Sequence, residues 1–539
     1  MKKINRLHLV VILVFSLLIR FVQISRYPIH LSMDEAAITY NAYSIAKTGK
    51  DEWNQKFPLA FKSAGDYKPP VAVYLTAPVV YVFGLNEFSS RFVSALLGGL
   101  TPFILYLLLI EIKINPKPSF FTSLWLAVLP WHIHFSRASF EAITALFFFV
   151  TGLYFWLKWL KHRHWSQLFF FVIAFSLSVW SYHAERLYVP LVTFYLFLSR
   201  RKSIIANLKK TNSKHLILIA LVFLIFTLPF LKLTFFTPAI TNRAASTSIL
   251  RESSLANSLH QNYHSLTEKI FDNNLFLILQ HWFNKYLSYF DFRFLFWKGL
   301  QFTPPQHPDL GILLPLDIII IAIGLFHLIN HGRKNHLYLF TALFFLGPLP
   351  ASLTMNYQHP LRALTWLPAF FIPIAYSFEY LTKIKWQKII LASLFIFYIT
   401  SLVFFVNIYT RLFPFFFSEY WQYGYKQASE YACQHQNEYA KIIISDTFGS
   451  DGPLNTGLPY LYVLLACNYP PEIFQQTRNT GKIQYRRADW AHDQYEKDML
   501  IVATPWDILD EHINQKQIIK TINYKNGKTA FLLIKTNEN

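Results

Sequence analysis

Apolar runs alternate with short polar segments along the first three quarters of the chain. A helix needs about 20 mostly apolar residues to cross the hydrocarbon core of a bilayer. By this measure the pattern predicts an α-helical polytopic membrane protein with about eleven transmembrane helices. The expected spans are Leu7–Ile24, Phe88–Ile112, Ser119–Ile133, Ala138–Leu160, Gln167–Tyr182, Leu187–Leu198, His215–Phe236, Leu310–Ile329, Leu337–Leu353, Leu361–Leu381 and Lys388–Tyr409.

Basic clusters test this count, because Lys and Arg gather on the cytoplasmic side of membrane proteins. Each even-numbered span is followed by such a cluster. The clusters are Lys113 with Lys117, Lys158–Arg163, Arg200–Lys210, Arg333 with Lys334, and Lys383 with Lys385 and Lys388. The pattern predicts a multi-pass protein of the cytoplasmic (inner) membrane, with its N-terminus inside and its C-terminus outside.

Two apolar runs of the membrane part fit more than one interpretation. Lys2, Lys3 and Arg6 before an apolar run resemble a signal peptide, but no small-x-small cleavage site follows, which favours an uncleaved first span. The run Val71–Phe83 is short and contains Pro78. We expect it to form a helix on the outer surface; treating it as a span would reverse the side of every later basic cluster.

The polar segments divide the chain into two predicted domains. Residues 1–411 form the membrane domain, with a first outer loop at about 25–87 and a second at about 237–309. Residues 412–539 alternate strand-like and helix-like runs, which predicts a small extracytoplasmic α/β domain. Cys433 and Cys467 both fall in this domain, where either a disulfide or two thiols fits the sequence.

Composition agrees with a membrane protein. Only 15% of the residues are charged, against about 25% in ordinary soluble proteins, and 53% are hydrophobic. The net charge of +20 would suit a nucleic-acid partner. The basic residues, however, lie in short clusters between apolar runs, as in cytoplasmic loops, so nucleic acid is excluded as a partner and membrane lipids are expected.

The stretch His30–Ala37 opens the first outer loop and carries two adjacent carboxylates, Asp34 and Glu35. Ser32 and Glu35 have the spacing of a helix capping box, and Gly49 is a suitable end for that helix. On these residues alone, a structural role and a functional role for the two acids are equally plausible.

Other ionisable residues fall mainly at the predicted outer ends of the spans. Because such groups are costly at membrane depth and tend to mark function, they predict a reaction centre at the outer face. Those outside the first acidic pair are Asp51, Asp66, Lys68, Arg91, His132, His134, Arg137, Glu141, His183, Glu185, Arg186, His359 and Arg362.

Several of these residues fit either a role in chemistry or a purely structural role. Lys68, Arg91 and Arg362 suit a phosphate, but cations also anchor helices at membrane interfaces. Arg137 and Glu141, four residues apart, would share a helix face and form an ion pair. His132 and His134 are weak candidates for metal ligands. No cofactor is required by these residues, and a divalent metal stays an open alternative.

A resemblance adds to this interpretation. Several motifs, within roughly residues 1–430, resemble the GT-C glycosyltransferases, above all bacterial members of the protein O-mannosyltransferase and lipid A aminoarabinose transferase group (families 39 and 83). The motifs are Asp34-Glu35-Ala36, Thr48-Gly49-Lys50-Asp51-Glu52, Asp66-Tyr67-Lys68-Pro69-Pro70, Ser90-Arg91-Phe92, Phe135-Ser136-Arg137-Ala138 with Glu141, His359-Pro360-Leu361-Arg362-Ala363 and Tyr423-Gly424-Tyr425-Lys426.

The resemblance implies a GT-C fold and roles for particular residues. Asp34 matches the first-loop acid of the family and would be the catalytic base, with Glu141 at the position of a second acid. Lys68 matches a phosphate-contacting lysine, helped by Arg91 and Arg362. Tyr67 replaces an acid that helps bind metal in some relatives, which argues against a metal here. Further residues expected to bind substrate are Glu35, Asp66, Tyr67, Arg137 and His359.

The sequence thus predicts a class of enzyme rather than a particular substrate. The expected activity is transfer of a sugar from a polyprenyl-phosphate donor to a lipid, glycan or protein acceptor, with inversion, at the outer face of the membrane. A transporter or flippase of envelope substrates is the alternative, although neither repeats nor broken midplane helices stand out. A membrane scaffold would not need the acids and bases of the first loop.

Overall fold

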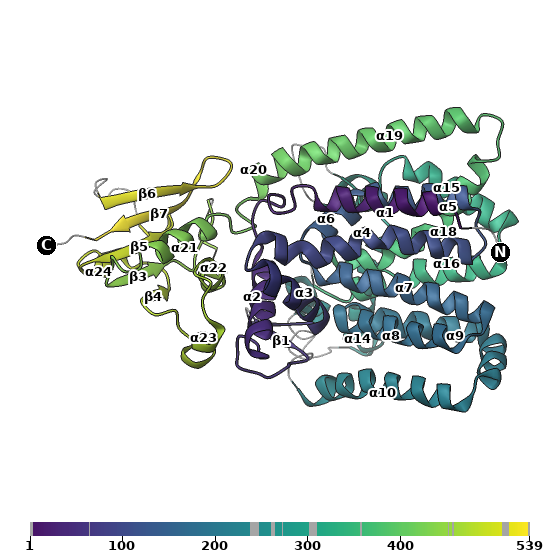
Figure 1. The fold of residues 1–539 in the computed structure, drawn as a ribbon, viewed down its shortest axis with the longest axis horizontal. Coiled ribbons are helices and arrows are strands. Elements are labelled where there is room, and N and C mark those ends of the chain that lie inside the picture. The colour runs from purple at the N-terminus through teal and green to yellow at the C-terminus, as the bar shows by residue number, and fades with distance from the viewer. Residues whose placement is uncertain are drawn as a thin grey trace.

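A computed structural model gives the fold of the chain, which is a bundle of long helices with a smaller α/β unit at one end (Figure 1). The structure describes residues 4–63, 65–237, 247–259, 265–271, 273–300, 310–355, 358–450, 452–454, 457–508 and 517–536. The helix nearest the N-terminus begins at the far end of the bundle from the C-terminal sheet (Figure 1). The sidedness of the two ends in a membrane stays a prediction.

The bundle helices follow the apolar runs of the sequence, since a helix satisfies its backbone hydrogen bonds internally. They are α1 Arg6–Phe21, α4 Glu87–Glu111, α5 Pro116–Val128, α6 Pro130–Arg137, α7 Glu141–His162, α8 Trp165–Ser181, α9 Glu185–Lys210, α10 Ser213–Phe236, α15 Asp317–His331, α16 Lys334–Leu346, α18 Phe371–Leu381 and α19 Gln387–Asn407. In the described ranges, four helical stretches are long and apolar enough to cross a membrane: Glu87–Glu111, Glu141–His162, Ser213–Phe236 and Gln387–Phe417. The number of eleven spans stays a prediction.

Prolines change two of the expected spans. The run Ser119–Ile133 is divided after Val128, because Pro130 lacks a backbone N–H and begins a new helix, α6. The run Leu361–Leu381 starts as a 3₁₀ helix, Arg362–Phe370, before α18. A further break at residues 138–140 puts Arg137 and Glu141 on different helices, so the expectation that they share one helix face was wrong.

The first outer segment lies across the end of the bundle, between it and the C-terminal sheet (Figure 1). It contains α2 Met33–Thr48, the hairpin β1 Phe61–Ser63 and β2 Asp66–Lys68, and α3 Pro70–Phe83. The predicted capping box of Ser32 and Glu35 is confirmed, and Gly49 ends α2 in the left-handed conformation, with φ of 69°. α2 and α3 pack against each other through Ile38, Ala42, Val73 and Ala77.

The C-terminal part of the chain contains a five-stranded sheet with the strand order β4-β3-β5-β7-β6. Its elements are α21 Tyr425–Gln434, β3 Lys441–Ile444, α22 Pro459–Ala466, α23 Pro471–Thr477, β4 Ile483–Tyr485, α24 Trp490–Asp493, β5 Met499–Ala503, β6 Ile518–Asn523 and β7 Thr529–Lys535. β3 pairs in parallel with β4 and β5, whereas β7 pairs antiparallel to β5 and β6. Of the two alternatives for the cysteines, the structure has the disulfide: Cys433 is bonded to Cys467.

The fold explains why Asp317, an isolated acid, occurs in an apolar run. It is fully buried at the start of α15. Its carboxylate accepts hydrogen bonds from Trp125 Nε1 at 3.0 Å, Tyr398 Oη at 2.6 Å and the backbone N–H of Leu314 at 2.8 Å. Asp317 therefore joins α5, α15 and α19, which is a structural role.

Candidate active site

Glu35 and Arg91 form an ion pair in which neither side chain is exposed. Arg91 Nε donates to Glu35 Oε1 at 2.9 Å. The same carboxylate accepts the backbone N–H of Ser139 at 3.0 Å and that of Ser32 at 2.9 Å. One carboxylate therefore holds together the start of α2, the first turns of α4 and the link between α6 and α7.

The rest of the Arg91 guanidinium is also occupied. Its Nη1 atom donates to the carbonyl oxygens of Ile24 at 2.8 Å and Pro28 at 2.9 Å, and Nη2 donates to the carbonyl oxygen of His30 at 2.7 Å. A longer contact of 3.5 Å joins Nη2 to Glu35 Oε2. An arginine has five N–H donors, and here all five are directed at protein oxygens.

This geometry bears on two predicted roles. Arg91 was expected to bind the donor phosphate and Glu35 to bind substrate. With no exposed surface and no spare donor, the pair instead fixes the chain that leads from α1 into α2. Of the two sequence readings of the adjacent acids, the structural one therefore applies to Glu35.

Asp34 differs from its neighbour, because its side chain is 42% exposed. Its carboxylate forms an ion pair with the ammonium group of Lys68, which is 6% exposed and stands at the end of β2. The structure thus brings together the predicted base and the predicted phosphate-binding lysine from positions 34 residues apart.

Lys68 lies in the field of several acids. Burial by itself would lower the pKa of Lys68, but the carboxylates of Asp34 and Glu141, with a contribution from Asp66, outweigh it and raise that pKa above its ordinary value. Lys68 is therefore a cation at every physiological pH. Glu141, at the start of α7, and Asp66, in β2, thus belong to the same electrostatic cluster as Asp34. This places four of the predicted site residues together.

Arg137 has a structural position rather than an open one. Its guanidinium donates to the carbonyl oxygens of Ile19, Arg20 and Val22 at the C-terminal end of α1, at 2.7, 3.1 and 2.9 Å. Carbonyls at a helix end lack partners within the helix and favour a cation. Arg137, predicted to bind substrate, instead caps α1 and supports the same segment as Arg91.

The two histidines do not fit a metal site. Nδ1 of His132 lies 2.6 Å from Nη2 of Arg20, so a guanidinium already faces it. The ring of His134 packs among aromatic side chains, including Phe135, Tyr409 and Trp421. Within the described part of the chain, no three His, Cys, Asp or Glu residues are grouped so that they could hold a metal ion.

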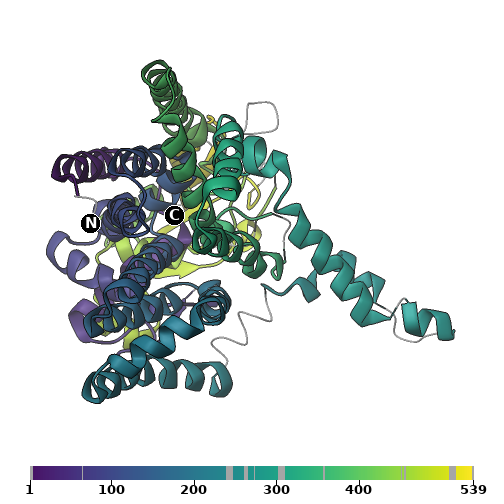
Figure 2. The same cartoon turned by 90° about the vertical axis from the view of Figure 1, so that its right-hand side faces the viewer.

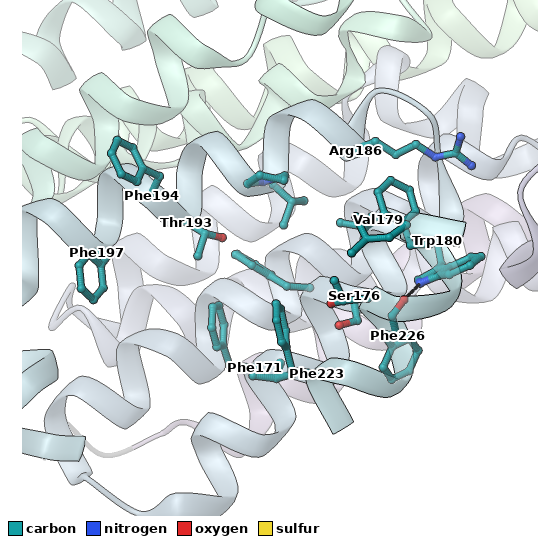
Figure 3. Close-up of a pocket in the computed structure, with 17 residues that line it drawn as sticks. Phe171, Ser176, Val179, Trp180, Arg186, Thr193, Phe194, Phe197, Phe223 and Phe226 are labelled. Atoms are coloured by element: carbon teal, nitrogen blue, oxygen red, sulfur yellow. Dashed lines mark hydrogen bonds between the residues drawn. The ribbon is translucent and has the colours of Figure 1, made fainter. Parts of the chain in front are cut away.

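An apolar cavity of about 570 Å³ lies between α8, α9 and α10. Aromatic side chains, among them Phe171, Phe194 and Phe223, form most of its wall, and Arg186 stands at one end (Figure 3). Such a cavity suits a hydrocarbon chain with an anionic group near the arginine.

A second cavity, of about 690 Å³, adjoins the first and shares Arg186 and Phe230 with it. Its wall also includes His183 and Arg362. Nε2 of His183 donates to the carbonyl oxygen of Tyr67 at 3.1 Å, directly before Lys68 in the chain. The two cavities therefore lead from the apolar side of the bundle toward the segment that carries Lys68.

This arrangement adds a residue to the candidate site. In the sequence, Arg186 is one of many ionisable residues at the predicted outer ends of the spans. Its position in the walls of both cavities distinguishes it from the others. Arg362, predicted to bind phosphate, lines the second cavity, where its Nη1 donates to Thr354 Oγ1 at 2.8 Å and to the carbonyl oxygen of Met355 at 2.7 Å. His359 lies nearby and its backbone N–H donates to Tyr289 Oη at 3.2 Å.

The C-terminal unit docks on the first outer segment. Tyr462 Oη donates to the carbonyl oxygen of Leu31 at 2.9 Å, close to Asp34 in the chain. Gln475 donates to Ser44 Oγ and Thr48 Oγ1, both at 2.9 Å, and the guanidinium of Arg478 lies over the ring of Trp53. The unit thus covers the loop that follows α2.

Comparisons with known proteins agree with the sequence motifs. Residues 67–232 match the family described as dolichyl-phosphate-mannose-protein mannosyltransferase, a segment that includes Lys68, Arg137 and Glu141. Over this segment the chain is similar to a family of glycosyltransferases. The predicted resemblance to the protein O-mannosyltransferases is thereby confirmed over residues 67–232.

One solved structure has the same fold, and further proteins are similar over part of the chain. ArnT from Cupriavidus metallidurans, bound to undecaprenyl phosphate, has a TM-score of 0.55 to this chain with 13% identity, and the match covers 97% of each chain. The Pmt1–Pmt2 protein O-mannosyltransferase of S. cerevisiae shares 22% identity over 48% of this chain and 37% of that chain, with a TM-score of 0.33, too low to carry an argument. An uncharacterized protein of Aquifex aeolicus (strain VF5) is 28% identical over 26% of this chain and 28% of its own length.

Removing the charge of Glu35 tests the role of the buried pair. We expect Glu35→Gln to lower the free energy of unfolding by on the order of 3–5 kcal/mol, because Arg91 would stay buried without a counter-ion. The readout is the midpoint of thermal unfolding of the purified protein in nanodiscs. Asp34→Asn is the comparison and should lower the midpoint less, because Asp34 is 42% exposed and Lys68 keeps the nearby carboxylates of Glu141 and Asp66. Equal effects of the two substitutions would contradict the distinction between the two acids.

A second prediction concerns Glu52, a buried acid beneath the docked C-terminal unit. Burial raises the pKa of Glu52 from 4.5 to about 7, although Asn41 and Arg478 partly offset it. Below pH 4.5 the group is protonated in both states. Between this pH and about 7 the folded protein keeps the proton that the unfolded chain loses, so stability falls as the pH rises, and above about 7 the loss is complete.

Thermal unfolding between pH 5 and pH 8 tests whether stability falls as the pH rises. The wild type should lose stability across the range relative to Glu52→Gln, by on the order of 3 kcal/mol at most. Comparison with that variant cancels the titration of all other groups. A difference between the two proteins that is constant with pH would show that Glu52 does not titrate in this range.

Proposed function

We propose that the protein is an inverting glycosyltransferase that moves a sugar from a polyprenyl-phosphate donor to a lipid, glycan or protein acceptor at the outer face of the cytoplasmic membrane. The observation that carries this proposal is the pairing of Asp34 with Lys68 in an electrostatic cluster with Glu141. The GT-C relationship supports the reaction class, and ArnT, which has the same fold, is bound to undecaprenyl phosphate in its structure.

The donor would use the two adjoining cavities. Its hydrocarbon chain suits the apolar cavity between α8, α9 and α10, and its phosphate suits the second cavity, which contains Arg186 and Arg362. The contact of His183 with the carbonyl oxygen of Tyr67 connects that cavity to Lys68. Arg91 has no part in this binding, because its donors are all directed at Glu35 and at backbone carbonyls.

Transfer of the sugar needs a proton acceptor and a stabilised leaving group. The acceptor oxygen attacks the anomeric carbon, its proton passes to the Asp34 carboxylate, and the bond from that carbon to the phosphate oxygen breaks. The electron pair of the broken bond stays on the phosphate, whose charge grows, and Lys68 stabilises that charge. An acid that starts the cycle ionised, as the ion pair with Lys68 ensures, can act as the base.

The ion pair also suggests how the base becomes active. Before the donor binds, Lys68 partly neutralises Asp34. A phosphate that binds Lys68 competes for that ammonium group and leaves the carboxylate more basic. The base would then be strongest when the donor is in place.

Donor turnover tests the proposal. The protein in nanodiscs is incubated with a panel of polyprenyl-phosphate sugars and a cell-envelope extract, and release of free polyprenyl phosphate is measured. Asp34→Asn should reduce release by about 10²–10⁴-fold, since it removes a general base. Glu141→Gln should have a smaller effect, because it acts on Lys68 from a distance.

The matched control is Asp489→Asn, at a 57% exposed acid of the C-terminal unit, which should release polyprenyl phosphate at the wild-type rate. Release that Asp34→Asn leaves unchanged would keep the enzyme class but overturn the assignment of the base. Absence of release with every donor and extract would contradict the proposed reaction.

A further inference from the structure

A third cavity, of about 660 Å³ and with a largely polar wall, lies at the junction of the bundle and the C-terminal unit. Part of its wall is formed by the segment after α1 and by Thr410 and Pro414, at the end of the helical stretch that begins with α19. The rest of the wall is formed by α21 and by the turn between β6 and β7. α1 and α19 lie on one side of the bundle and α8 to α10 on the other in both views (Figures 1 and 2). The cavity is therefore separate from those that lead to Lys68.

Two cations of this cavity have no acidic partner. Arg26 and Lys525 form no ion pair among the described residues, and both are exposed. Each lies over an aromatic ring of the same wall, with Arg26 5.5 Å from the ring centre of Tyr27 and Lys525 5.0 Å from that of Tyr423. The chain thus holds two positive charges across one cleft without neutralising them.

The third cation, Lys426, is already neutralised. It forms an ion pair with Glu87 and lies 3.8 Å from Glu430. His30, which also lines the cavity, is neutral, because burial lowers its pKa to about 4 and its Nδ1 donates to the carbonyl oxygens of Leu31 and Trp421. The wall therefore carries three cations, Arg26, Lys426 and Lys525, against two carboxylates, Glu87 and Glu430, and its net charge is +1. Arg26 and Lys525 are the two of these cations that lie outside the ion-pair group of Lys426.

The fold places both cations at the expected depth of lipid head groups. Arg26 follows the end of α1 by five residues, and the backbone N–H of Lys525 donates to Ser418 Oγ at 3.2 Å, next to α20 (Phe413–Phe417). Phe415, in α20, is 44% exposed, and Tyr420, shortly after the end of α20, is 69% exposed. Exposed aromatic side chains at helix ends are typical of the membrane–water interface, where anionic phospholipids carry their phosphates.

We propose that this cleft, formed by Arg26, Lys525 and the wall between α1, α19 and α21, binds the phosphate head group of an anionic membrane phospholipid. The phosphate lies between the guanidinium of Arg26 and the ammonium group of Lys525, and the acyl chains run down the outside of α1 and α19. The lipid joins the C-terminal unit to the bundle at a point where the two are held on the protein side by the Lys426–Glu87 pair.

Native mass spectrometry of the purified protein tests this site. The protein is mixed with phosphatidylglycerol or with phosphatidylcholine of the same acyl chains, and bound lipid is counted. We expect the wild type to retain phosphatidylglycerol in preference. Arg26→Gln combined with Lys525→Gln should weaken that binding about tenfold, since each cation near anionic lipid contributes to affinity.

The matched control is Lys497→Gln with Lys520→Gln, which removes the same charge from two exposed lysines of the C-terminal unit outside the cleft. It should bind lipid like the wild type. Each single substitution in the cleft should give part of the loss, and the unfolding midpoint should stay constant. Equal binding of the two lipids by the wild type, an equal loss in the control, or displacement of the lipid by a modest excess of inorganic phosphate would overturn the proposal.

Discussion

The ion pair of Glu35 and Arg91 is the constraint on which the candidate site depends. Removing two charges from water costs several kcal/mol, and the pair is stable only because the remaining polar atoms also have partners. Those partners are the backbone carbonyls of Ile24, Pro28 and His30, with the N–H groups of Ser32 and Ser139. The segment between α1 and α2 is therefore fixed, and so is the start of α2.

A fixed Glu35 decides where Asp34 lies. Successive residues of an α-helix point about 100° apart, so burying one acid of an adjacent pair turns the other outward. Asp34 is accordingly 42% exposed and meets Lys68, which the β1–β2 hairpin holds in place. Arg137, by capping α1, supports the same frame from its other side. Glu35, Arg91 and Arg137 thus have structural partners, and Asp34 and Lys68, which they position, are the residues proposed to carry out the chemistry.

Much of this could be predicted from the sequence. The capping box of Ser32 and Glu35, and Gly49 as the end of α2, depend on local backbone chemistry, so short motifs were sufficient. The apolar runs gave the bundle helices, because hydropathy and helix length are also local properties. The break at Pro130 was missed, since a proline inside an apolar run does not alter the hydropathy.

The burial of particular charged residues could not be predicted in this way. An arginine at the outer end of a helix can anchor at the interface, bind phosphate or face the interior, and the sequence around Arg91 fits all three. The carbonyl oxygens that hold Arg91 in the interior belong to residues 24–30, and they contact Arg91 only in the folded chain. Likewise, Arg186 became a candidate only because two cavities meet beside it.

The central claim is that Lys68 beside Asp34, and not Arg91, receives the phosphate of a polyprenyl donor. A cryo-electron microscopy structure of the protein in nanodiscs with bound polyprenyl phosphate measures this directly. We expect phosphate oxygens within hydrogen-bond distance of Lys68 Nζ, with Arg91 still paired to Glu35. A phosphate held by Arg91, with Glu35 displaced, would contradict it.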